Sequence, residues 1–207
     1  MSSPRSIVLG THNRKKGEEL ARLLAPTGLA VLTLADFPNA ITVAEEGDSF
    51  AANAARKAIE QARHLGQWVL GEDSGLLVDA LGGAPGVFSA RWSGPDATDE
   101  SNNRQLLEAL GDTPLQRRTA RYICHMTLAD PQGTVRAESE AACRGRMVLA
   151  PRGSHGFGYD PLFELVEWHR TFGELGPVVK AHLSHRSRAA VRLIPHLIGL
   201  LGSPPSA

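Results

Sequence analysis

The alternation of strand and helix signals in the first third of the chain constrains the fold more than any other feature. The runs SIVLG (6–10) and LAVLTL (29–34) are short and apolar, which predicts buried strands. Helical patterns with cap candidates follow at residues 13–25 and 48–66. QWVLGED (67–73) predicts a third strand that ends in two acids. This strand-helix-strand-helix-strand order is typical of a layered α/β core.

The rest of the chain adds two helices and a hairpin. Residues 98–110 and 184–201 have helical patterns, whereas residues 120–130 alternate as a strand does. DPQG (130–133) has proline second and glycine fourth, which is typical of a tight turn. Residues 134–150 then return as a partner strand. We therefore expect an α/β fold that contains a long antiparallel hairpin.

Composition limits the class of protein. The 207 residues carry 22 basic and 22 acidic side chains, and this zero net charge argues against a protein that coats nucleic acid. No apolar run reaches the length of a signal peptide or a membrane span. Cys124 and Cys143 lack the spacing of metal ligands and do not suggest a disulfide framework. We expect a cytoplasmic protein with neither a membrane nor a nucleic-acid partner.

Adjacent acids stand at the end of the third predicted strand. Ligands of α/β folds usually bind at this edge of the sheet. Neighbouring strand residues point to opposite faces, so Glu72 and Asp73 need not share one metal, and either could pair with Glu45 or Glu46. Mg²⁺ typically takes one or two carboxylates plus substrate phosphates. The alternative is a plain strand end, followed by the glycine- and proline-rich turns of residues 79–86.

The segment after the first strand, GTHNRKKGEE (10–19), resembles an anion-binding loop. A loop that enters a helix exposes backbone N–H groups where the helix dipole favours anions. Thr11 and Asn13 add hydrogen bonds, and Lys15 or Lys16 adds positive charge. The alternative is a solvated helix face, because the dipole disfavours lysines in a first turn.

A second loop, SHGFGYDPLF (154–163), combines glycines, aromatic rings and an Asp-Pro pair. We interpret it as a stiff loop that presents Phe157 and Tyr159 for stacking on a planar base. The alternative is a structural turn whose aromatic rings belong to the core.

Basic residues gather in KAHLSHRSRA (180–189), at the predicted start of the last helix. The helix dipole disfavours cations at this position, so the cluster indicates a bound anion or a base carbonyl. Its members are Lys180, His182, His185, Arg186 and Arg188. A surface helix with basic decoration is the alternative. Taken together, these segments supply the parts needed to bind a nucleoside triphosphate with Mg²⁺.

Four ordered blocks carry a resemblance to a known family, the inosine/xanthosine triphosphate pyrophosphatases that clear non-standard purine nucleotides. They are GTHNRKKGEE (10–19), EDSGLLVDALGGAPGVFSARWSG (72–94), GFGYDPLF (156–163) and SHRSRA (184–189). The similarity spans residues 7 to 190.

The resemblance implies Mg²⁺-dependent hydrolysis of a nucleoside triphosphate, such as ITP, dITP or XTP, to the monophosphate and pyrophosphate. It also implies a homodimer and an elongated, two-lobed α/β fold, with a mixed sheet flanked by helices. Residues 1–207 would form this single two-lobed catalytic domain, with a frayed tail at 202–207.

The resemblance also implies roles for individual residues. Asp73 would be the proton acceptor and a metal ligand, with Glu45 as the second ligand ahead of Glu46 and Glu72. The expected substrate-binding residues are Thr11, His12, Asn13, Arg14, Lys15, Lys16, Ser74, Phe157, Gly158, Tyr159, Asp160, Lys180, His185 and Arg186.

The chain departs from the family pattern at two places. His12 replaces the usual glycine of the phosphate loop, and Glu72 replaces the more usual aspartate. The alternatives to a purine pyrophosphatase are a pyrophosphatase for modified pyrimidine nucleotides and a non-enzymatic RNA-binding module built on Phe157 and Tyr159.

Overall fold

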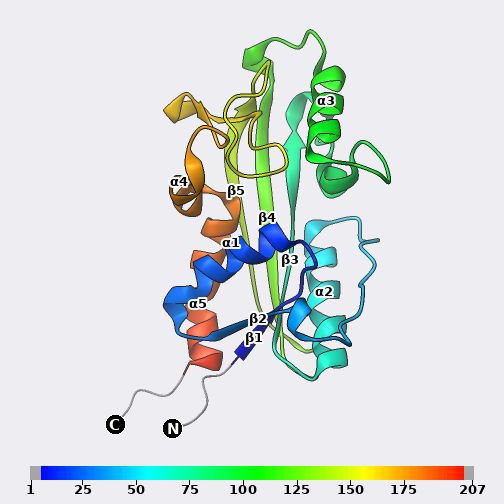
Figure 1. The fold of residues 1–207 in the computed structure, drawn as a ribbon, viewed down its shortest axis with the longest axis vertical. Helices are drawn as coiled ribbons and strands as arrows, with labels where there is room; N and C mark the ends of the chain where they lie inside the picture. Colours follow the sequence, from blue (N-terminus) through cyan, green and yellow to red (C-terminus); the bar gives the residue numbers. More distant parts are fainter. Residues whose placement is uncertain (1–5, 203–207) are drawn as a thin grey trace. The chain divides into compact units, whose positions relative to one another are not determined.

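The computed structural model describes residues 6–202, which form two compact units (Figure 1). Within the described residues, the first unit comprises 6–73, 124–141 and 186–202, and the second comprises 74–123 and 142–185. Of the predicted frayed tail, residues 203–207 lie outside the described residues.

The strands follow the spatial order β2-β1-β3-β4-β5-β6-β7. β1 runs parallel to β2 and β3, whereas β5, β6 and β7 pair antiparallel, so the sheet is mixed. The prediction of an α/β fold with a mixed sheet is therefore confirmed. The strands are β1 (Ser6–Leu9), β2 (Ala30–Thr33), β3 (Val69–Val78), β4 (Thr119–Ala129), β5 (Val135–Met147), β6 (Phe163–Leu165) and β7 (Arg170–Thr171).

Helices accompany the strands in both units. The α-helices are α1 (Arg14–Leu24), α2 (Phe50–Leu65), α3 (Asp99–Leu110), α4 (Gly176–Leu183) and α5 (His185–Leu201). The 3₁₀ segments are η1 (Ala25–Thr27), η2 (Leu34–Asp36), η3 (Asp79–Leu81), η4 (Gly86–Arg91), η5 (Leu115–Arg117) and η6 (Val166–Trp168). Among residues 6–202, no helix is both long and apolar enough to cross a membrane.

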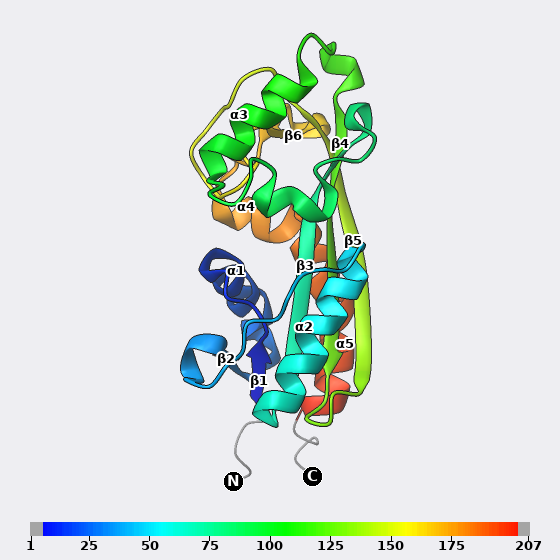
Figure 2. The same cartoon turned by 90° about the vertical axis from the view of Figure 1, so that its right-hand side faces the viewer.

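Alternation along β1 divides the core of the first unit between two faces. Ile7 and Leu9 join a buried cluster with the apolar residues of α1 and α5. Val8 points the other way and packs with Ala58 and Ala62 of α2. Figure 2 accordingly shows α1 and α2 on different sides of β1 and β3.

Local capping explains the ends of the first two helices. The Asn13 side chain accepts a hydrogen bond from the Lys16 N–H, and the Ser49 side chain accepts one from the Ala52 N–H. Gly66 ends α2 in the left-handed conformation, with φ of 63°. Both helices were predicted within one or two residues.

The hairpin is also confirmed. β4 and β5 are neighbours in the sheet and are joined by residues 130–134 alone, a connection short enough to require antiparallel strands. The Gly133 N–H donates to the Asp130 carbonyl at 2.7 Å, which closes the predicted turn.

Aromatic rings fill much of the core of the second unit. The Tyr122 and Phe163 ring centroids lie 4.7 Å apart, and Phe163 stacks on Phe172 at 5.5 Å. Apolar residues from β3, α3 and β5 complete this cluster, among them Leu76, Val78, Leu106, Leu110, Cys143 and Met147.

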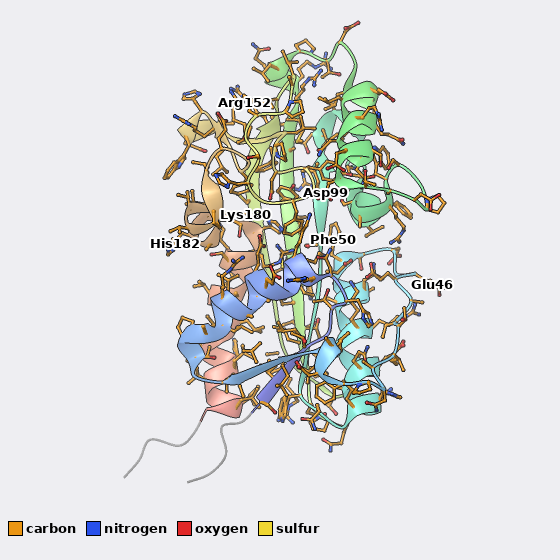
Figure 3. The ribbon with its side chains drawn as sticks, viewed as in Figure 1. Glu46, Phe50, Asp99, Arg152, Lys180 and His182 are labelled. Carbon is orange, nitrogen blue, oxygen red and sulfur yellow. The ribbon has the colours of Figure 1, made fainter. Side chains whose placement is uncertain are left out.

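One predicted boundary is wrong, and one helix was not predicted. β3 does not end at Asp73 but continues to Val78, because Leu76 and Val78 find buried apolar partners in the second unit's core. A separate helix, α4, precedes the last one, with a proline in its first turn. Lys180 and His182 therefore lie near the end of α4 rather than at a helix start (Figure 3).

Candidate active site

The loop between β1 and α1 has the geometry of an anion-binding helix entry. Thr11 Oγ1 accepts a hydrogen bond from the Asn13 N–H at 3.1 Å, and Asn13 Oδ1 accepts one from the Lys16 N–H at 3.1 Å. The side chains of His12, Asn13, Arg14 and Lys15 are exposed, so the loop lies open to a ligand.

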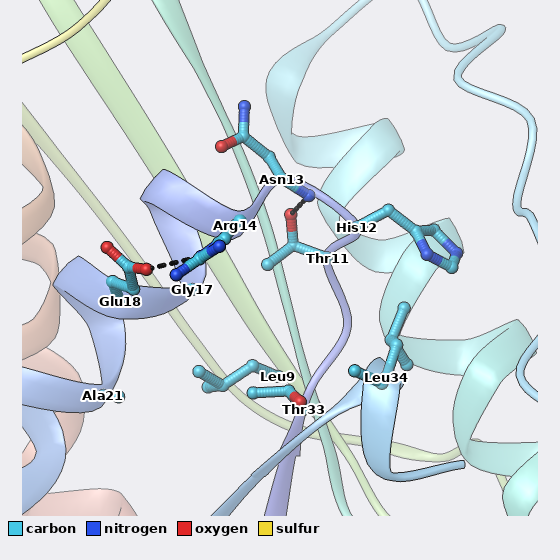
Figure 4. Close-up of a pocket in the computed structure, with 11 residues that line it drawn as sticks. Leu9, Thr11, His12, Asn13, Arg14, Gly17, Glu18, Ala21, Thr33 and Leu34 are labelled. Atoms are coloured by element: carbon cyan, nitrogen blue, oxygen red, sulfur yellow. Dashed lines mark hydrogen bonds and ion pairs between the residues drawn. The ribbon is translucent and has the colours of Figure 1, made fainter. Parts of the chain in front are cut away.

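A pocket of about 490 Å³ lies against this loop (Figure 4). The Arg14 guanidinium and the Glu18 carboxylate pair at 2.8 Å beside it. Its lining comes wholly from the first unit: Leu9, Thr11, His12, Asn13, Arg14, Gly17, Glu18, Ala21, Thr33, Leu34 and Ala35.

Asp73 is buried, and its two carboxylate oxygens have different partners. Oδ1 lies 3.0 Å from Lys57 Nζ, and Oδ2 accepts a hydrogen bond from Asn53 Nδ2 at 3.1 Å. Burial raises the pKa of Asp73 above its ordinary value, although the positive charges of Lys57 and Lys16 oppose this shift. A carboxylate with a raised pKa binds a proton more readily than an exposed aspartate does.

Lys57 joins Asp73 to Glu45. Its Nζ lies 2.7 Å from Glu45 Oε1, so one ammonium group contacts both carboxylates. Burial acts to lower the pKa of Lys57, but the charges of Asp73 and Glu45 outweigh it, and the pKa is raised. The acids predicted from separate parts of the chain are thus brought together.

The loop that carries Glu45 is held by side chains of α2. His64, Gln61, Arg56 and Asn53 project at intervals of three to five residues and bond main-chain atoms of this loop. Their contacts are His64 Nε2 with the Asn39 carbonyl, the Gln61 amide with Ile41, Arg56 with the Ala44 carbonyl, and Asn53 with the N–H and carbonyl of Gly47.

His12 reaches the same loop. Its Nε2 lies 3.1 Å from the Ile41 carbonyl oxygen, which also accepts a hydrogen bond from Gln61. The residue that departs from the family pattern therefore links the loop between β1 and α1 to the segment before Glu45.

Glu72 faces away from Asp73. Its Oε2 lies 3.2 Å from Lys16 Nζ, and its Oε1 accepts hydrogen bonds from Arg186 at 3.0 Å and from the Cys124 thiol at 3.3 Å. The prediction that the two acids point to opposite faces of the strand is confirmed.

The donor set suits a small, hard cation. Glu45 and Asp73 supply carboxylate oxygens, and the Lys57 ammonium between them shows that the pair accommodates a positive charge. Within residues 6–202, no cluster of three or more histidine, cysteine or acidic side chains has metal-binding geometry. A cation held here would therefore need further ligands from substrate or water, as Mg²⁺ commonly has.

In the second unit, Lys180 and Asp160 form a buried ion pair beside Phe157. Lys180 Nζ lies 2.6 Å from Asp160 Oδ2 and 4.3 Å from the centroid of the Phe157 ring. The Phe157 N–H donates to the same carboxylate oxygen at 2.9 Å. The Phe157 side chain is only half-buried. This arrangement fixes one aromatic ring at the surface of the unit.

Tyr159 does not present its ring, contrary to the interpretation of this loop. It is 3% exposed and belongs to the core of the second unit, where its hydroxyl donates to the Ser89 carbonyl at 2.8 Å. Burial raises the pKa of this hydroxyl. His185 is also buried and stacks on Tyr122, with ring centroids 4.7 Å apart.

The geometric argument for the basic cluster is wrong for Lys180. Lys180 lies in the last turn of α4, where the helix dipole favours a cation. The charge of Lys180 therefore does not indicate a bound anion. Arg186 does lie in the first turn of α5, but Glu19 and Glu72 neutralise it.

Comparison with known proteins decides the family. A model of the Ham1 family matches residues 7–196. The chain belongs to the Ham1 family. The resemblance drawn from the four sequence blocks is thereby confirmed.

Curated relatives of this Ham1-family chain match it over most of its length. It is 53% identical to the dITP/XTP pyrophosphatase of Rhodopirellula baltica over 197 residues, which cover 95% of each chain. It is 47% identical to the dITP/XTP pyrophosphatase of Geobacillus kaustophilus, over 91% of this chain and 92% of the relative.

Solved structures agree with the fold. A HAM1 protein from Coxiella burnetii superposes with a TM-score of 0.84 at 34% identity, over 94% of this chain and 99% of its own. A dITP/XTP pyrophosphatase from Mycobacterium abscessus superposes with a TM-score of 0.74 at 40% identity, over 93% of this chain and 99% of its own.

Each unit of this Ham1-family chain holds part of the predicted site. The first unit contains Thr11, His12, Asn13, Arg14, Lys15, Lys16, Glu45, Asp73 and Arg186. The second contains Ser74, Phe157, Gly158, Tyr159, Asp160, Lys180 and His185. Their roles in binding and catalysis stay predictions.

Sequence reasoning missed Lys57 and Asn53, the partners of Asp73. With Gln61 they stand four residues apart along α2 and are buried, next to the buried Ala54, Ala58 and Ala62. A polar residue repeated every fourth position inside an alanine-rich face is the signal that could have found them.

Proposed function

We propose that this chain is a Mg²⁺-dependent nucleoside-triphosphate pyrophosphatase acting on non-standard purine nucleotides. ITP, dITP and XTP would be hydrolysed to the monophosphate and pyrophosphate. The observation that carries the proposal is that Asp73 and Glu45 both contact the buried Lys57. The same unit holds the exposed loop between β1 and α1, which would bind the phosphates. Its curated relatives named dITP/XTP pyrophosphatase support the same activity.

The first unit would bind and cleave the triphosphate. Loop N–H groups and Lys16 would neutralise the phosphate charge, with Asp73 and Glu45 as the ligands of Mg²⁺. When bound, Mg²⁺ would offset the charge of the phosphates and of the leaving pyrophosphate. Asp73 would accept a proton from water as the water adds to the α-phosphorus and the bond to the β-phosphate breaks.

The second unit would hold the base. The half-buried Phe157 ring offers a face for stacking, and its neighbours Asp160 and Lys180 keep it in place. Hypoxanthine, the base of inosine, and xanthine present a 6-oxo acceptor and an N1–H donor. Adenine presents a 6-amino donor and an N1 acceptor instead. Adenine would leave polar groups of the base site without hydrogen bonds. This would weaken binding more than a poor fit of shape does, so ATP would be rejected.

The deciding experiment is a product assay that distinguishes pyrophosphate from phosphate. We expect pyrophosphate from ITP, dITP and XTP with Mg²⁺, none after chelation, and recovery when Mg²⁺ is restored. ATP and GTP should react far more slowly. Equal rates for ITP, ATP and GTP would refute the assigned selectivity, and release of single phosphate would refute the reaction.

The same assay separates the rival functions. Rapid hydrolysis of modified pyrimidine triphosphates, with ITP slow, would assign the other pyrophosphatase activity. An electrophoretic shift with RNA in the absence of pyrophosphate release would favour a binding module. We also propose a homodimer in the cytoplasm. The free thiols Cys124 and Cys143 agree with a reducing compartment.

A further inference from the structure

Asn53 is a buried amide beside the two acids of the first unit. It lies near the start of α2 and is 1% exposed. Its Nδ2 donates to Asp73 Oδ2 at 3.1 Å, and its Oδ1 accepts a hydrogen bond from the Gly47 N–H at 2.8 Å. One side chain therefore joins the carboxylate of Asp73 to the main chain two residues beyond Glu45.

The two partners of Asn53 match the chemistry of an amide. Asp73 offers acceptor oxygens and Gly47 offers an N–H donor, so the side chain between them must donate on one side and accept on the other. A neutral amide does both. A carboxylate at this position would repel Asp73, and an apolar side chain would leave both partners without these bonds.

Gly47 packs directly against the amide of Asn53. A Cβ at residue 47 would lie 2.6 Å from Asn53 Oδ1 and 3.0 Å from the Cβ of Ala52, which is closer than side chains normally approach. The main chain can make this contact only because residue 47 has no side chain. The segment that carries Glu45 is thus held against the same amide that binds Asp73.

The carboxylate oxygens of Asp73 meet two different residues of α2. Lys57 Nζ lies 3.0 Å from Oδ1, and Asn53 donates to Oδ2. Partners at both oxygens fix the rotation of the carboxylate, which one partner would leave free. Lys57 also contacts Glu45, but its ammonium group acts as a point charge, whereas the bonds of the amide are directional. The direction of the Asp73 carboxylate relative to the Glu45 segment therefore depends on Asn53.

We propose that Asn53 is a positioning residue that sets the direction of the Asp73 carboxylate and the place of the Glu45 segment together. This rests on the proposed function, in which Asp73 accepts a proton and Glu45 is a metal ligand. Because Asn53 is buried, it acts through these groups rather than on the nucleotide. Its loss would displace the two acids, and a displacement of about 1 Å can lower a rate by about 10²-fold.

The test compares Asn53→Ala with the wild type in release of pyrophosphate from ITP with Mg²⁺. We expect kcat to fall by about 10- to 100-fold, with KM unchanged, because Asn53 makes no contact with the nucleotide. In the Asp73→Asn background the same substitution should lower kcat by about threefold at most, since much of its effect passes through Asp73. A second loss as large as the first would overturn the proposal. A folded Asn53→Ala protein with wild-type kcat would overturn it as well.

Asn102→Ala is the matched control. Asn102 is a buried amide of α3 in the second unit and is 4% exposed. Its Oδ1 accepts a hydrogen bond from the Ser93 N–H at 2.8 Å, and its Nδ2 donates to the Ala90 carbonyl at 3.2 Å. The substitution removes a comparable pair of bonds outside the proposed site, so kcat should stay at the wild-type value. Equal losses of kcat in Asn102→Ala and Asn53→Ala would contradict a specific role of Asn53.

A second variant covers failure of Asn53→Ala to fold. Gly47→Ala keeps Asn53 in the chain but forces its amide to move away from residue 47. We expect kcat to fall about fivefold with KM unchanged, because the amide is displaced rather than lost. Wild-type kcat in a folded Gly47→Ala protein would count against the proposal.

Hydrogen exchange tests the contact of Asn53 with Gly47 without turnover. In the nucleotide-free protein the Gly47 N–H is bonded to Asn53, so Asn53→Ala should speed its exchange about fivefold in a peptide that covers residues 40–49. Unchanged exchange would show that Asn53 does not hold this segment, and the proposal would fall. This measurement needs no reaction, so absence of pyrophosphate release by the wild type would reject the proposed function and leave the exchange result valid.

Discussion

Asp73 and Glu72 are neighbours in the chain with opposite surroundings. Successive side chains of a strand leave on opposite faces, so Asp73 meets α2 and Glu72 meets α1 and α5. Glu72 is enclosed by two cations. Asp73 shares one lysine with Glu45, and burial raises its pKa. This difference between the two acids supports the proposal that Asp73 is the proton acceptor.

Asp73→Asn should remove activity while preserving the fold. The amide matches the carboxylate in size but cannot accept a proton, so we expect pyrophosphate release from ITP to fall by about 10²–10⁴-fold. Circular dichroism should match the wild type. Near-normal turnover in this variant would show that Asp73 is not the proton acceptor.

At the scale of elements, close contact between α2 and β3 positions the acidic site. Gly71 of β3 faces the backbone of α2, and a Cβ at this position would lie 2.2 Å from the Ala54 carbonyl oxygen. The helix can approach the strand this closely only because residue 71 has no side chain. Lys57 reaches Asp73 as a consequence.

Gly71→Ala should therefore destabilise the protein by about 3 kcal/mol, because a main-chain atom must move to admit the methyl group. Chemical denaturation provides the measurement. Gly199→Ala is the matched control, since a methyl group at this position of α5 would meet nothing within 4 Å among residues 6–202 beyond its own helix backbone. That substitution should leave stability unchanged or raise it by up to about 1 kcal/mol. Similar effects at both glycines would contradict the packing argument.

Glu164 links β6 to β5 through an ion pair with Arg146. Burial acts to raise the pKa of Glu164, but hydrogen bonds from Arg146 and Arg152 outweigh it and hold the pKa below the ordinary 4.5. A depressed pKa means that the folded state releases this proton more readily than the unfolded state. The stability from this group is therefore present above pH 4.5 and is lost as the pH falls through the folded value.

Glu164→Gln should lower the free energy of unfolding by about 2 kcal/mol at pH 7. This value lies between those typical of exposed and of buried ion pairs. The difference from the wild type should shrink as the pH falls below 4.5. Urea unfolding at pH 7 and at pH 3 measures both differences. A difference that does not change between these two pH values would mean that the charge of Glu164 contributes nothing.

At the scale of the whole molecule, each compact unit is assembled from separate stretches of chain. Strands β3, β4 and β5 contribute residues to both units, so the chain enters each unit more than once. The loop between β1 and α1 and the acids Glu45 and Asp73 fall in one unit, and the Phe157 loop falls in the other. Neither unit alone contains every residue predicted to bind the substrate.

The proposed homodimer is tested on the intact protein. Light scattering coupled to size-exclusion chromatography should give twice the 22.2 kDa mass of the chain at micromolar concentration. A single peak at the mass of one chain, unchanged up to the highest concentration measured, would contradict the dimer.

Features that depend on residues close together in the chain were predictable. The caps at Asn13 and Ser49 act over three residues, Gly66 ends α2 by its own backbone conformation, and the turn at 130–133 closes on itself. These interactions form within one or two turns of chain, so local residue types determine them.

Features that depend on distant partners were missed or misread. The end of β3, the position of Lys180 on α4, the burial of Tyr159 and the contact of Lys57 with Asp73 could not be predicted. Tyr159 is a core residue because its hydroxyl meets a carbonyl seventy residues earlier in the chain.

The sequence by itself determined the order of the helices and strands from β1 to β5, the ends of the first helices and the four blocks that indicate the family. Only the tertiary structure decided which side chains are buried together. Burial and charge pairing depend on groups that approach one another after the chain has folded, and no local pattern contains their distances. For this reason Glu72 and Asp73, adjacent in sequence, have separate partners.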